Sequence, residues 1–240
     1  MKSADDIYPH ELARTLSDVA RSLEAEPDEE WTLHGIVHAA VSTVPGVSSA
    51  VIIEVVGKRA GPRVSTDELV RKCDEAQSEL GDGPCLEAIR EQDTVVVDDM
   101  SAESRWPRFA TRASGLGVGS MISFQLYVTR DTLGALNLYG DTGVSFGEEA
   151  RIIGELFASH AAIAMSVART QRQLGEALNT RDVIGQAKGI LMRRENIIGL
   201  QAFDLLIRTS QETNIRLADV AAWLVQDHEQ PGGAPRPRRR

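Results

Sequence analysis

Apolar residues recur along the start of the chain at the spacing of a helix surface. Four of them, three or four residues apart, predict a first helix that ends at Pro27. They are Leu12, Leu16, Val19 and Leu23. A second helix is predicted over 31–44, because Pro45-Gly46 stops it. The β-branched run 47–56 then predicts a buried strand.

The middle of the chain alternates short strand patterns with helical ones. Strands are predicted over 63–66, 94–97, 120–128 and 133–139, and helices over 67–80 and 85–91. The segments 120–128 and 133–139 flank a few turn residues, so we expect an antiparallel hairpin. The segment around Trp106-Pro107 is interpreted as a loop. This order predicts an α+β domain built on an antiparallel sheet with flanking helices.

A long helix is predicted over 147–195, where proline is absent and most residues favour helices. Apolar positions in it alternate spacings of four and three, which predicts the seam of a dimerising coiled coil. The seam positions are Ile163, Val167, Thr170, Leu174, Ala177, Arg181, Ile184, Lys188 and Leu191. The alternative is that this stripe packs on its own domain.

Two short amphipathic helices are predicted after the long one. The first carries Ala202, Phe203, Leu206 and Ser210 on one face, and the second carries Leu217, Val220, Ala221 and Leu224. Both are expected to pack against Ile190 and Leu191. The pair Ile198-Gly199 offers no side-chain cap, so the first of them is expected to begin loosely. Residues 230–240, with three prolines and four arginines, predict a disordered basic tail.

The composition indicates an acidic body with a basic end. The formal net charge is -9, yet residues 180–240 contain ten Lys or Arg against seven Asp or Glu. Such a chain is not expected to coat nucleic acid indiscriminately, since phosphate binding depends on clustered cations. Cys73 and Cys85 are too few for a disulfide framework, so we expect reduced thiols in a cytoplasmic protein. No membrane span is expected, because glycine, serine and glutamine interrupt the longest uncharged stretch, 113–129.

Four blocks near the C-terminus resemble the ANTAR domain, an RNA-binding antitermination module. They are 184–193 (IGQAKGILMR), 202–206 (AFDLL), 210–214 (SQETN) and 217–221 (LADVA). The resemblance implies a three-helix module that binds RNA hairpins with short loops, usually two in tandem, one per protomer of a dimer. Binding would hold the transcript in a form that excludes the terminator stem.

The side chains in the first block have the chemistry that RNA recognition requires. Gln186 can both donate and accept hydrogen bonds at a base edge. Lys188, Arg193 and Arg194 supply positive charge for phosphates. The predicted RNA-binding residues are Arg181, Gln186, Ala187, Lys188, Gly189, Arg193 and Arg194. On charge pattern alone, the solvated face of an amphipathic helix is the simpler interpretation, and the motif favours RNA.

Gly185 and Gly189 lie four residues apart on one predicted helix face. Glycine inside a helix costs roughly 0.5–1 kcal/mol relative to alanine, so a compensating reason is expected. Close approach of another backbone is that reason, and it could come from RNA or from the two following helices.

Three further blocks resemble the landmarks of a GAF domain. They are 79–88 (ELGDGPCLEA), 105–109 (RWPRF) and 133–139 (LGALNLY). The resemblance covers roughly 10–168 and implies a domain that either holds a small molecule on one face of its sheet or serves only as a dimerising platform. The predicted pocket residues are Cys85, Asp98, Met121 and Asn137. Structural roles stay open for them, with Cys85 as a small buried hydrophobe and Asp98 as a turn cap.

The sequence contains no recognisable catalytic or metal-binding arrangement. His34 and His38 have the spacing of a metal pair, but a third ligand is not evident. The glycines of 115–119 precede a predicted strand, so they are interpreted as loop residues rather than a phosphate-binding loop. We therefore expect no enzyme and no identifiable cofactor beyond an unknown small-molecule ligand of the GAF domain.

The sequence thus predicts a GAF sensor domain over 10–168, a coiled-coil and ANTAR segment over 169–229, and a tail over 230–240. The expected function is that of a signal-responsive antitermination regulator that binds RNA hairpins and forms a homodimer through the helix 147–195. One alternative makes 217–223 the recognition helix of a DNA-binding protein, but the acidic Asp219 there counts against DNA as a partner. Another alternative is a GAF-based dimeric interaction module without RNA activity.

Overall fold

A computed structural model of the protein describes residues 29–57, 59–91, 93–129 and 131–229. The helix predicted to end at Pro27 and the tail predicted over 230–240 lie outside the described residues. The chain divides into two compact units, with the boundary between Ala168 and Arg169.

The first unit is built on a five-stranded antiparallel sheet with the strand order β2-β1-β5-β4-β3. Its strands are β1 (Ser49–Val56), β2 (Arg59–Ser65), β3 (Val95–Val97), β4 (Ser120–Val128) and β5 (Asp131–Gly140). The predicted hairpin is formed by β4 and β5, which pair from Ser120 with Gly140 to Val128 with Asp131. Since β2 is an edge strand, it can include Pro62. The predicted α+β fold on an antiparallel sheet is confirmed.

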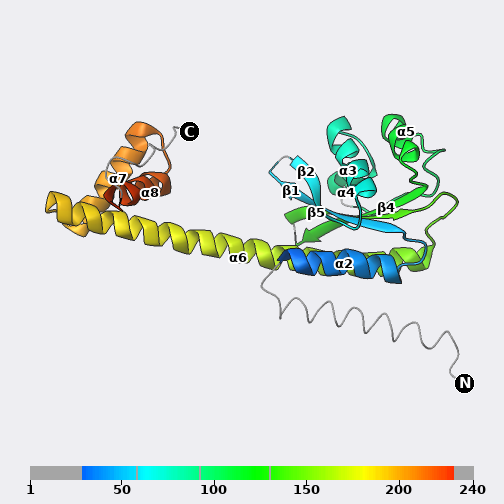
Figure 1. Cartoon of the computed structure of the whole chain (residues 1–240), viewed down its shortest axis with the longest axis horizontal. Coiled ribbons are helices and arrows are strands. Elements are labelled where there is room, and N and C mark those ends of the chain that lie inside the picture. The colour runs from blue at the N-terminus through cyan, green and yellow to red at the C-terminus, as the bar shows by residue number, and fades with distance from the viewer. Residues whose placement is uncertain (1–28, 58, 92, 130, 230–240) are drawn as a thin grey trace, which may run out of the picture. The chain divides into compact units, whose positions relative to one another are not determined.

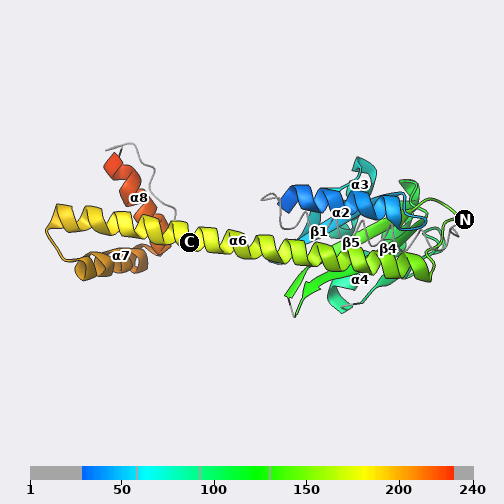
Figure 2. The same cartoon turned by 90° about the horizontal axis from the view of Figure 1, so that it is seen from below.

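Helices cover both faces of this sheet (Figure 1). One face carries α3 (Glu68–Leu80), α4 (Pro84–Glu91) and α5 (Pro107–Gly115); the other carries α2 (Glu29–Thr43) and the first part of α6 (Glu148–Glu195). Figure 2 looks onto the second face and shows α2 beside α6. Along β1, Ala50 and Ile52 join the core under α2 and α6, whereas Val51 and Ile53 join the opposite core. The continuous apolar run of β1 therefore reflects a strand buried on both faces.

The segment interpreted as a loop around Trp106 contains helix α5, so that part of the prediction is wrong. Pro107 occupies the first turn of α5, where the missing N–H and the fixed φ of proline are tolerated. Trp106 and Phe109 are buried in the core on this side of the sheet. The Arg105 guanidinium lies 4.3 Å above the Trp106 ring and donates to the Val96 carbonyl at 2.7 Å. The block 105–109 thus fixes α5 onto the edge of the sheet.

Helix α6 begins as a core helix. By length and composition alone it contains a window apolar enough to cross a membrane, with a mean hydropathy of 1.2, but half of that window is buried within the protein. Gly154 brings this helix close to the sheet, because a Cβ at that position would lie 2.5 Å from the Phe124 ring. This packing accounts for the buried half of the apolar window.

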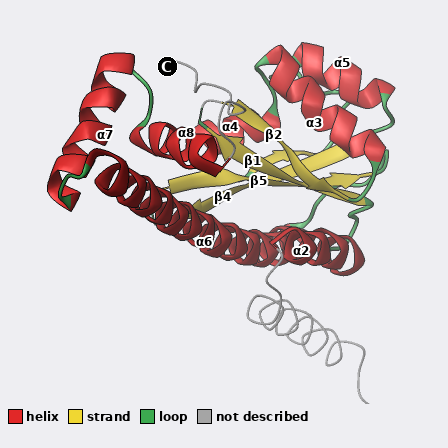
Figure 3. Cartoon of the chain, turned by 60° about the vertical axis from the view of Figure 1, so that its left-hand side comes forward, coloured by secondary structure: helices red, strands yellow, loops and turns green. Residues whose placement is uncertain are grey.

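The second unit is a three-helix module, in which α7 (Gly199–Thr213) and α8 (Leu217–Glu229) pack against the end of α6 (Figure 3). Its buried core consists of Ala187, Leu191, Ala202, Leu206, Val220, Ala221 and Leu224. Of the predicted faces, Ala202 and Leu206 of α7 and Val220, Ala221 and Leu224 of α8 are buried, whereas Phe203 and Ser210 are only half-buried and do not belong to this core.

The turns of this module are closed by polar residues. Asn196 and Asn214 adopt left-handed conformations after α6 and α7, with φ of 54° and 53°, a region that asparagine tolerates better than most residues. As expected, the Ile198 side chain supplies no cap for α7. The Ile198 N–H donates to Gln201 Oε1 at 3.1 Å, so the glutamine provides one of the two hydrogen bonds of a capping box.

Candidate functional site

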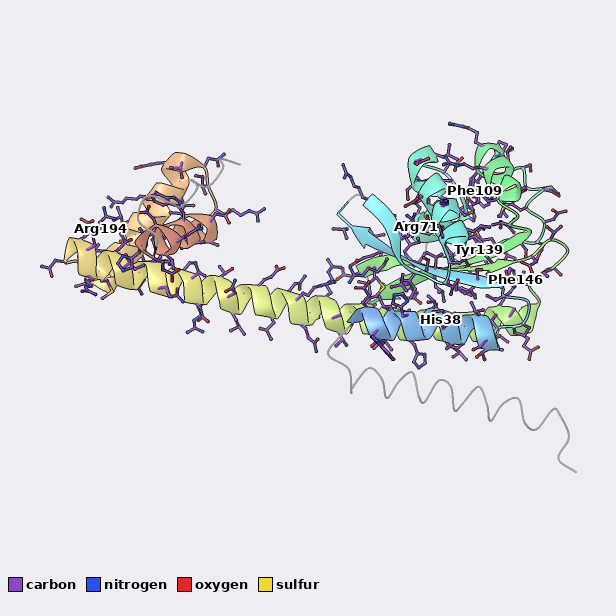
Figure 4. All side chains as sticks on the ribbon, viewed as in Figure 1. His38, Arg71, Phe109, Tyr139, Phe146 and Arg194 are labelled. Carbon is purple, nitrogen blue, oxygen red and sulfur yellow. The ribbon has the colours of Figure 1, made fainter. Side chains whose placement is uncertain are left out.

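A groove of about 710 Å³ lies in the C-terminal module, lined by residues of α6 and α8. Its lining consists of Gln186, Gly189, Ile190, Arg193, Arg194, Val225, His228 and Glu229. Four of the predicted RNA-binding residues, namely Gln186, Gly189, Arg193 and Arg194, therefore share one concave surface. Figure 4 labels Arg194 near the end of α6.

The other predicted RNA-binding residues lie elsewhere on α6. The Lys188 side chain extends over the start of α7, since a Cβ on Gly199 would lie 3.3 Å from its Cε and 3.5 Å from its Nζ. Arg181 is exposed two turns earlier on the helix. Ala187 is 0% exposed and packs in the three-helix core, so its assignment to the RNA-contacting surface is wrong. Its methyl group faces α7 and α8 because it lies on the apolar stripe of α6.

The face of α6 that carries Gly185 and Gly189 is open. A Cβ added at either glycine would meet no atom within 4 Å. The expectation that α7 or α8 approaches these glycines is therefore wrong, because both helices pack on the side of α6 marked by Ala187 and Leu191. Among the described residues, neither α7 nor α8 makes a close approach at these glycines.

The polar side chains of the groove are largely uncommitted. Within the described part of the chain, Gln186 makes no side-chain hydrogen bond and Arg193 makes no ion pair. Arg194 Nε lies 3.4 Å from Glu195 Oε1. Exposed pairs of this kind contribute only about 0–1 kcal/mol, so a ligand can displace them.

Exposed apolar side chains on α6 follow the predicted seam only in part. Ile163, Val167 and Leu174 are exposed, at 49%, 47% and 61%, as a seam requires. Leu191 and Ile184 instead pack in the core of the C-terminal module. The exposed large apolar residues of α6 are Ile152, Leu156, Ile163, Val167, Leu174, Leu178 and Met192. The first six are spaced alternately by four and seven residues, a period of eleven residues, which is close to three helical turns.

In the first unit, a buried polar network surrounds Asp74 of α3. Asp74 Oδ1 accepts hydrogen bonds from Gln77 Nε2 at 2.7 Å and from Asn137 Nδ2 at 2.6 Å. Asn137 Oδ1 in turn accepts from Ser123 Oγ at 2.6 Å. Gln77 Oε1 accepts from the Cys85 N–H at 2.8 Å. The network therefore joins α3 and α4 to strands β4 and β5.

The burial of this network perturbs its titratable groups. Burial raises the pKa of Asp74 to about 7, although the donated hydrogen bonds oppose the rise. Asp74 Oδ2 and the Tyr139 hydroxyl are buried without a well-aligned hydrogen-bond partner among the described residues. Burial, with the carboxylate of Asp74 beside them, raises the pKa of the Cys73 and Cys85 thiols well above the usual range. These thiols are consequently poor nucleophiles near neutral pH.

The predicted sensor residues divide between this buried region and the surface. Cys85, Met121 and Asn137 lie together on the face of the sheet covered by α3, α4 and α5. Asp98 is exposed in the loop after β3, so its placement in the same pocket is wrong. Large side chains fill the region, among them Met100, Trp106, Phe109 and Tyr139. Figure 4 labels Phe109 and Tyr139 on this side of the sheet.

Asp74 and Gln77 are functional candidates that the sequence analysis missed. The sequence does offer one indication of a buried carboxylate, because Asp74 shares the apolar face of the helix predicted over 67–80 with Val70 and Cys73. An open hollow of about 480 Å³ lies nearby, lined by residues of β1, β2, α3 and α4. None of the four predicted sensor residues lines it.

The described residues contain no group of three or more His, Cys, Asp or Glu side chains that could hold a metal. His34 and His38 stack on the exposed side of α2, with ring centroids 6.4 Å apart. Figure 4 labels His38 on this helix.

Comparison with known families agrees with this division of the chain. The GAF domain matches residues 26–166, and the ANTAR domain matches residues 172–225. The chain belongs to the GAF domain family and carries an ANTAR domain at its C-terminal end. ANTAR domains are RNA-binding antitermination modules and GAF domains sense signals, so this architecture is that of a regulator. No functionally curated protein matches the sequence at a significant level.

Solved structures support the fold of the first unit. The GAF domain of a phosphoenolpyruvate-protein phosphotransferase from Coxiella burnetii is 14% identical, with a TM-score of 0.55 over 68% of this chain and 96% of that one. The corresponding domain from Acinetobacter is 13% identical, with a TM-score of 0.53 over 68% and 97%. A free methionine-R-sulfoxide reductase from Neisseria meningitidis, solved with its substrate, is 18% identical, with a TM-score of 0.51 over 71% and 95%. At these identities the similarity establishes the fold alone.

Proposed function

We propose that this protein is a transcription antitermination regulator that binds paired hairpins in nascent RNA in response to a signal received by its GAF domain. The observation that carries the proposal is the ANTAR match over 172–225 together with the exposed, uncommitted Gln186 and Arg193 on α6. A base edge requires an amide that donates and accepts, and phosphates require cations beside it. Gln186 and Arg193 provide both within the groove.

Lys188 extends the positive surface to the other side of α6. Its ammonium group lies beside the start of α7. The N-terminus of a helix already carries a partial positive charge, so this lysine is unfavourable there unless an anion is bound. A phosphate of the hairpin stem would offset that cost.

Two protomers would present two such surfaces. The exposed apolar residues of α6, such as Leu174 and Leu178 in the C-terminal unit and Ile163 and Val167 in the first, support a homodimer formed through this helix. After one hairpin binds, the second meets its site at a high effective concentration, so tandem hairpins are held more tightly than either one alone.

Antitermination then follows as a population shift of the transcript. The protein binds the RNA form that lacks the terminator stem and does not bind the form that contains it. Binding therefore raises the population of the first form. Converting a 1:99 equilibrium to 99:1 requires a difference of about 5.5 kcal/mol, which two linked hairpin contacts can supply. We further propose a cytoplasmic regulator without catalytic activity. The buried, protonated Cys73 and Cys85 are unsuited to thiol catalysis.

The proposal is tested by binding of the full-length protein to tandem hairpins, to a single hairpin and to duplex DNA at several salt concentrations. Arg193→Ala should weaken hairpin binding and reduce the slope of log affinity against log salt by about 0.7, the loss of one phosphate contact. Arg208→Ala is the matched control, because Arg208 is exposed on α7 and lies outside the groove. Equal losses for the two variants would mean that net charge, rather than this surface, governs binding.

Transcription in vitro provides the functional readout. A template that carries the two hairpins before a terminator should show increased read-through when the wild-type protein is added, and no increase when one hairpin loop is scrambled. Tight binding to duplex DNA with no loop-dependent RNA binding would replace this proposal with the DNA-binding alternative.

A further inference from the structure

The groove of the C-terminal module has the volume and the lining of a site for a small ligand with an apolar part. Its volume of about 710 Å³ is in the range of small-molecule sites. Ile190 and Val225 supply its apolar part, from α6 and α8 respectively. Gly189 adds no side chain, and a Cβ there would meet nothing within 4 Å, so the α6 backbone is accessible to a ligand at this position.

Charge favours an anionic ligand in this groove. Arg193 and Arg194 line it together with only one carboxylate, Glu229. Arg193 has no ion-pair partner within the described residues. Gln186 supplies an amide whose hydrogen bonds are not used inside the described chain. Two guanidinium groups beside an amide and an apolar surface match a nucleotide, which combines a phosphate, a polar base edge and an apolar base face.

His228 is the aromatic side chain of the groove. It lies in the last turn of α8, exposed, and lines the groove together with the α6 residues. The matched ANTAR segment ends at residue 225, so His228 lies three residues beyond it. Unpaired RNA bases are commonly held by stacking on aromatic side chains, histidine included.

We propose that this groove receives one unpaired base of the RNA loop and that His228 is a specificity-determining residue on which the base stacks. Gln186 contacts the edge of that base, and the two arginines contact the flanking phosphates. The inference rests on the proposed RNA-binding function and adds to it a base-reading site built jointly by α6 and α8.

The test uses the full-length protein and a library of hairpins with randomised loops. Wild type should enrich loops with a preferred base at one position. His228→Ala should lose that preference and bind the selected hairpin about tenfold more weakly, as expected for one lost stacking contact. His228→Phe, which retains an aromatic face, should restore most of the affinity. Gln226→Ala is the matched control, because Gln226 is exposed on the same turn of α8 but does not line the groove.

The site can be located directly with the selected RNA. A photoreactive thio-analogue of the preferred base at that loop position, such as 4-thiouridine for uridine or 6-thioguanosine for guanosine, should cross-link to the peptide that contains His228. Equal melting temperatures of the wild type and the His228 variants exclude unfolding as the cause of a loss.

The outcomes separate the two proposals. Loop-selective binding by the wild type that persists unchanged in His228→Ala would overturn the base-reading groove and leave the proposed function intact. An equal loss for every loop sequence, without a change in preference, would reduce His228 to a general contact and also overturn it. A wild-type protein that enriches no hairpin would overturn both proposals and leave the groove to another partner, such as an acidic peptide.

Discussion

Replacing Asp74 by asparagine should remove a pH dependence from the stability of the GAF domain. Asp74 is fully enclosed between α3 and the sheet, and its Oδ1 accepts from Gln77 and Asn137. Asparagine has the same shape and keeps an oxygen for both donors, but it cannot ionise. The substitution therefore removes the titration while it preserves most of the packing and hydrogen bonding.

The magnitude follows from the pKa of the buried carboxyl. Burial raises the pKa of Asp74 from 3.8 to about 7. Each pH unit between the unfolded and folded pKa values corresponds to about 1.4 kcal/mol, so ionisation of Asp74 costs the folded state about 4 kcal/mol. Below pH 3.8 the group is protonated in both states and this cost is absent. As the pH rises to about 7, the unfolded chain releases the proton first, and the folded state loses stability until both states are ionised.

The assay is urea unfolding of the full chain at several pH values. Trp106 is buried in the first unit, and replacing Trp31 and Trp223 with phenylalanine in all variants leaves it as the single tryptophan reporter. The difference in free energy of unfolding between Asp74→Asn and its parent should grow by up to about 4 kcal/mol from about pH 4 to about pH 8. Asp98→Asn, in an exposed loop, controls for the loss of one carboxylate. Parallel pH profiles for the parent and Asp74→Asn would refute the reasoning.

Three other results are expected. Gly189→Ala should raise the stability of the C-terminal module by about 0.5–1 kcal/mol, because no atom opposes the new methyl group and alanine favours the helix. The same substitution should weaken RNA binding. Thermal unfolding measures the first effect and hairpin titration the second, and unchanged RNA binding would contradict close approach of RNA at this glycine. Leu174→Glu should shift the protein toward the monomer in analytical ultracentrifugation, because it places a charge among the exposed apolar residues of α6. An unchanged molecular mass would exclude this part of α6 from the dimer contact. Cys73 and Cys85, buried and with raised pKa values, should react with a thiol reagent only after denaturation, and rapid labelling of the native protein would show that their region opens.

Local patterns in the sequence were sufficient for most elements of the fold. The hairpin of β4 and β5 and the apolar faces of α7 and α8 followed from spacing, because alternation and helical periodicity depend on near neighbours. Helix α5 was missed, since its nine residues give a short pattern that begins at a proline. The hydrogen bond from the Ile198 N–H to Gln201 was missed because Gln201 lies inside the helix rather than before it.

The candidate sites depended more on tertiary structure. The motif located Gln186 and Arg193 on a helix, but a motif match does not separate residues that contact RNA from residues such as Ala187, which packs in the core with Ile184 and Leu191. The motif also could not bring His228 of α8 beside Arg193, because that proximity depends on the angle at which two helices pack.

In the first unit, the sequence by itself determined the antiparallel sheet and the flanking helices other than α5. Only the tertiary structure placed Asp74 against Asn137, 63 residues away, and enclosed both from water. A sequence pattern indicates which residues are buried, but the pKa of a carboxyl group depends on all the groups that surround it. Those surroundings are assembled from distant segments and exist only in the folded chain.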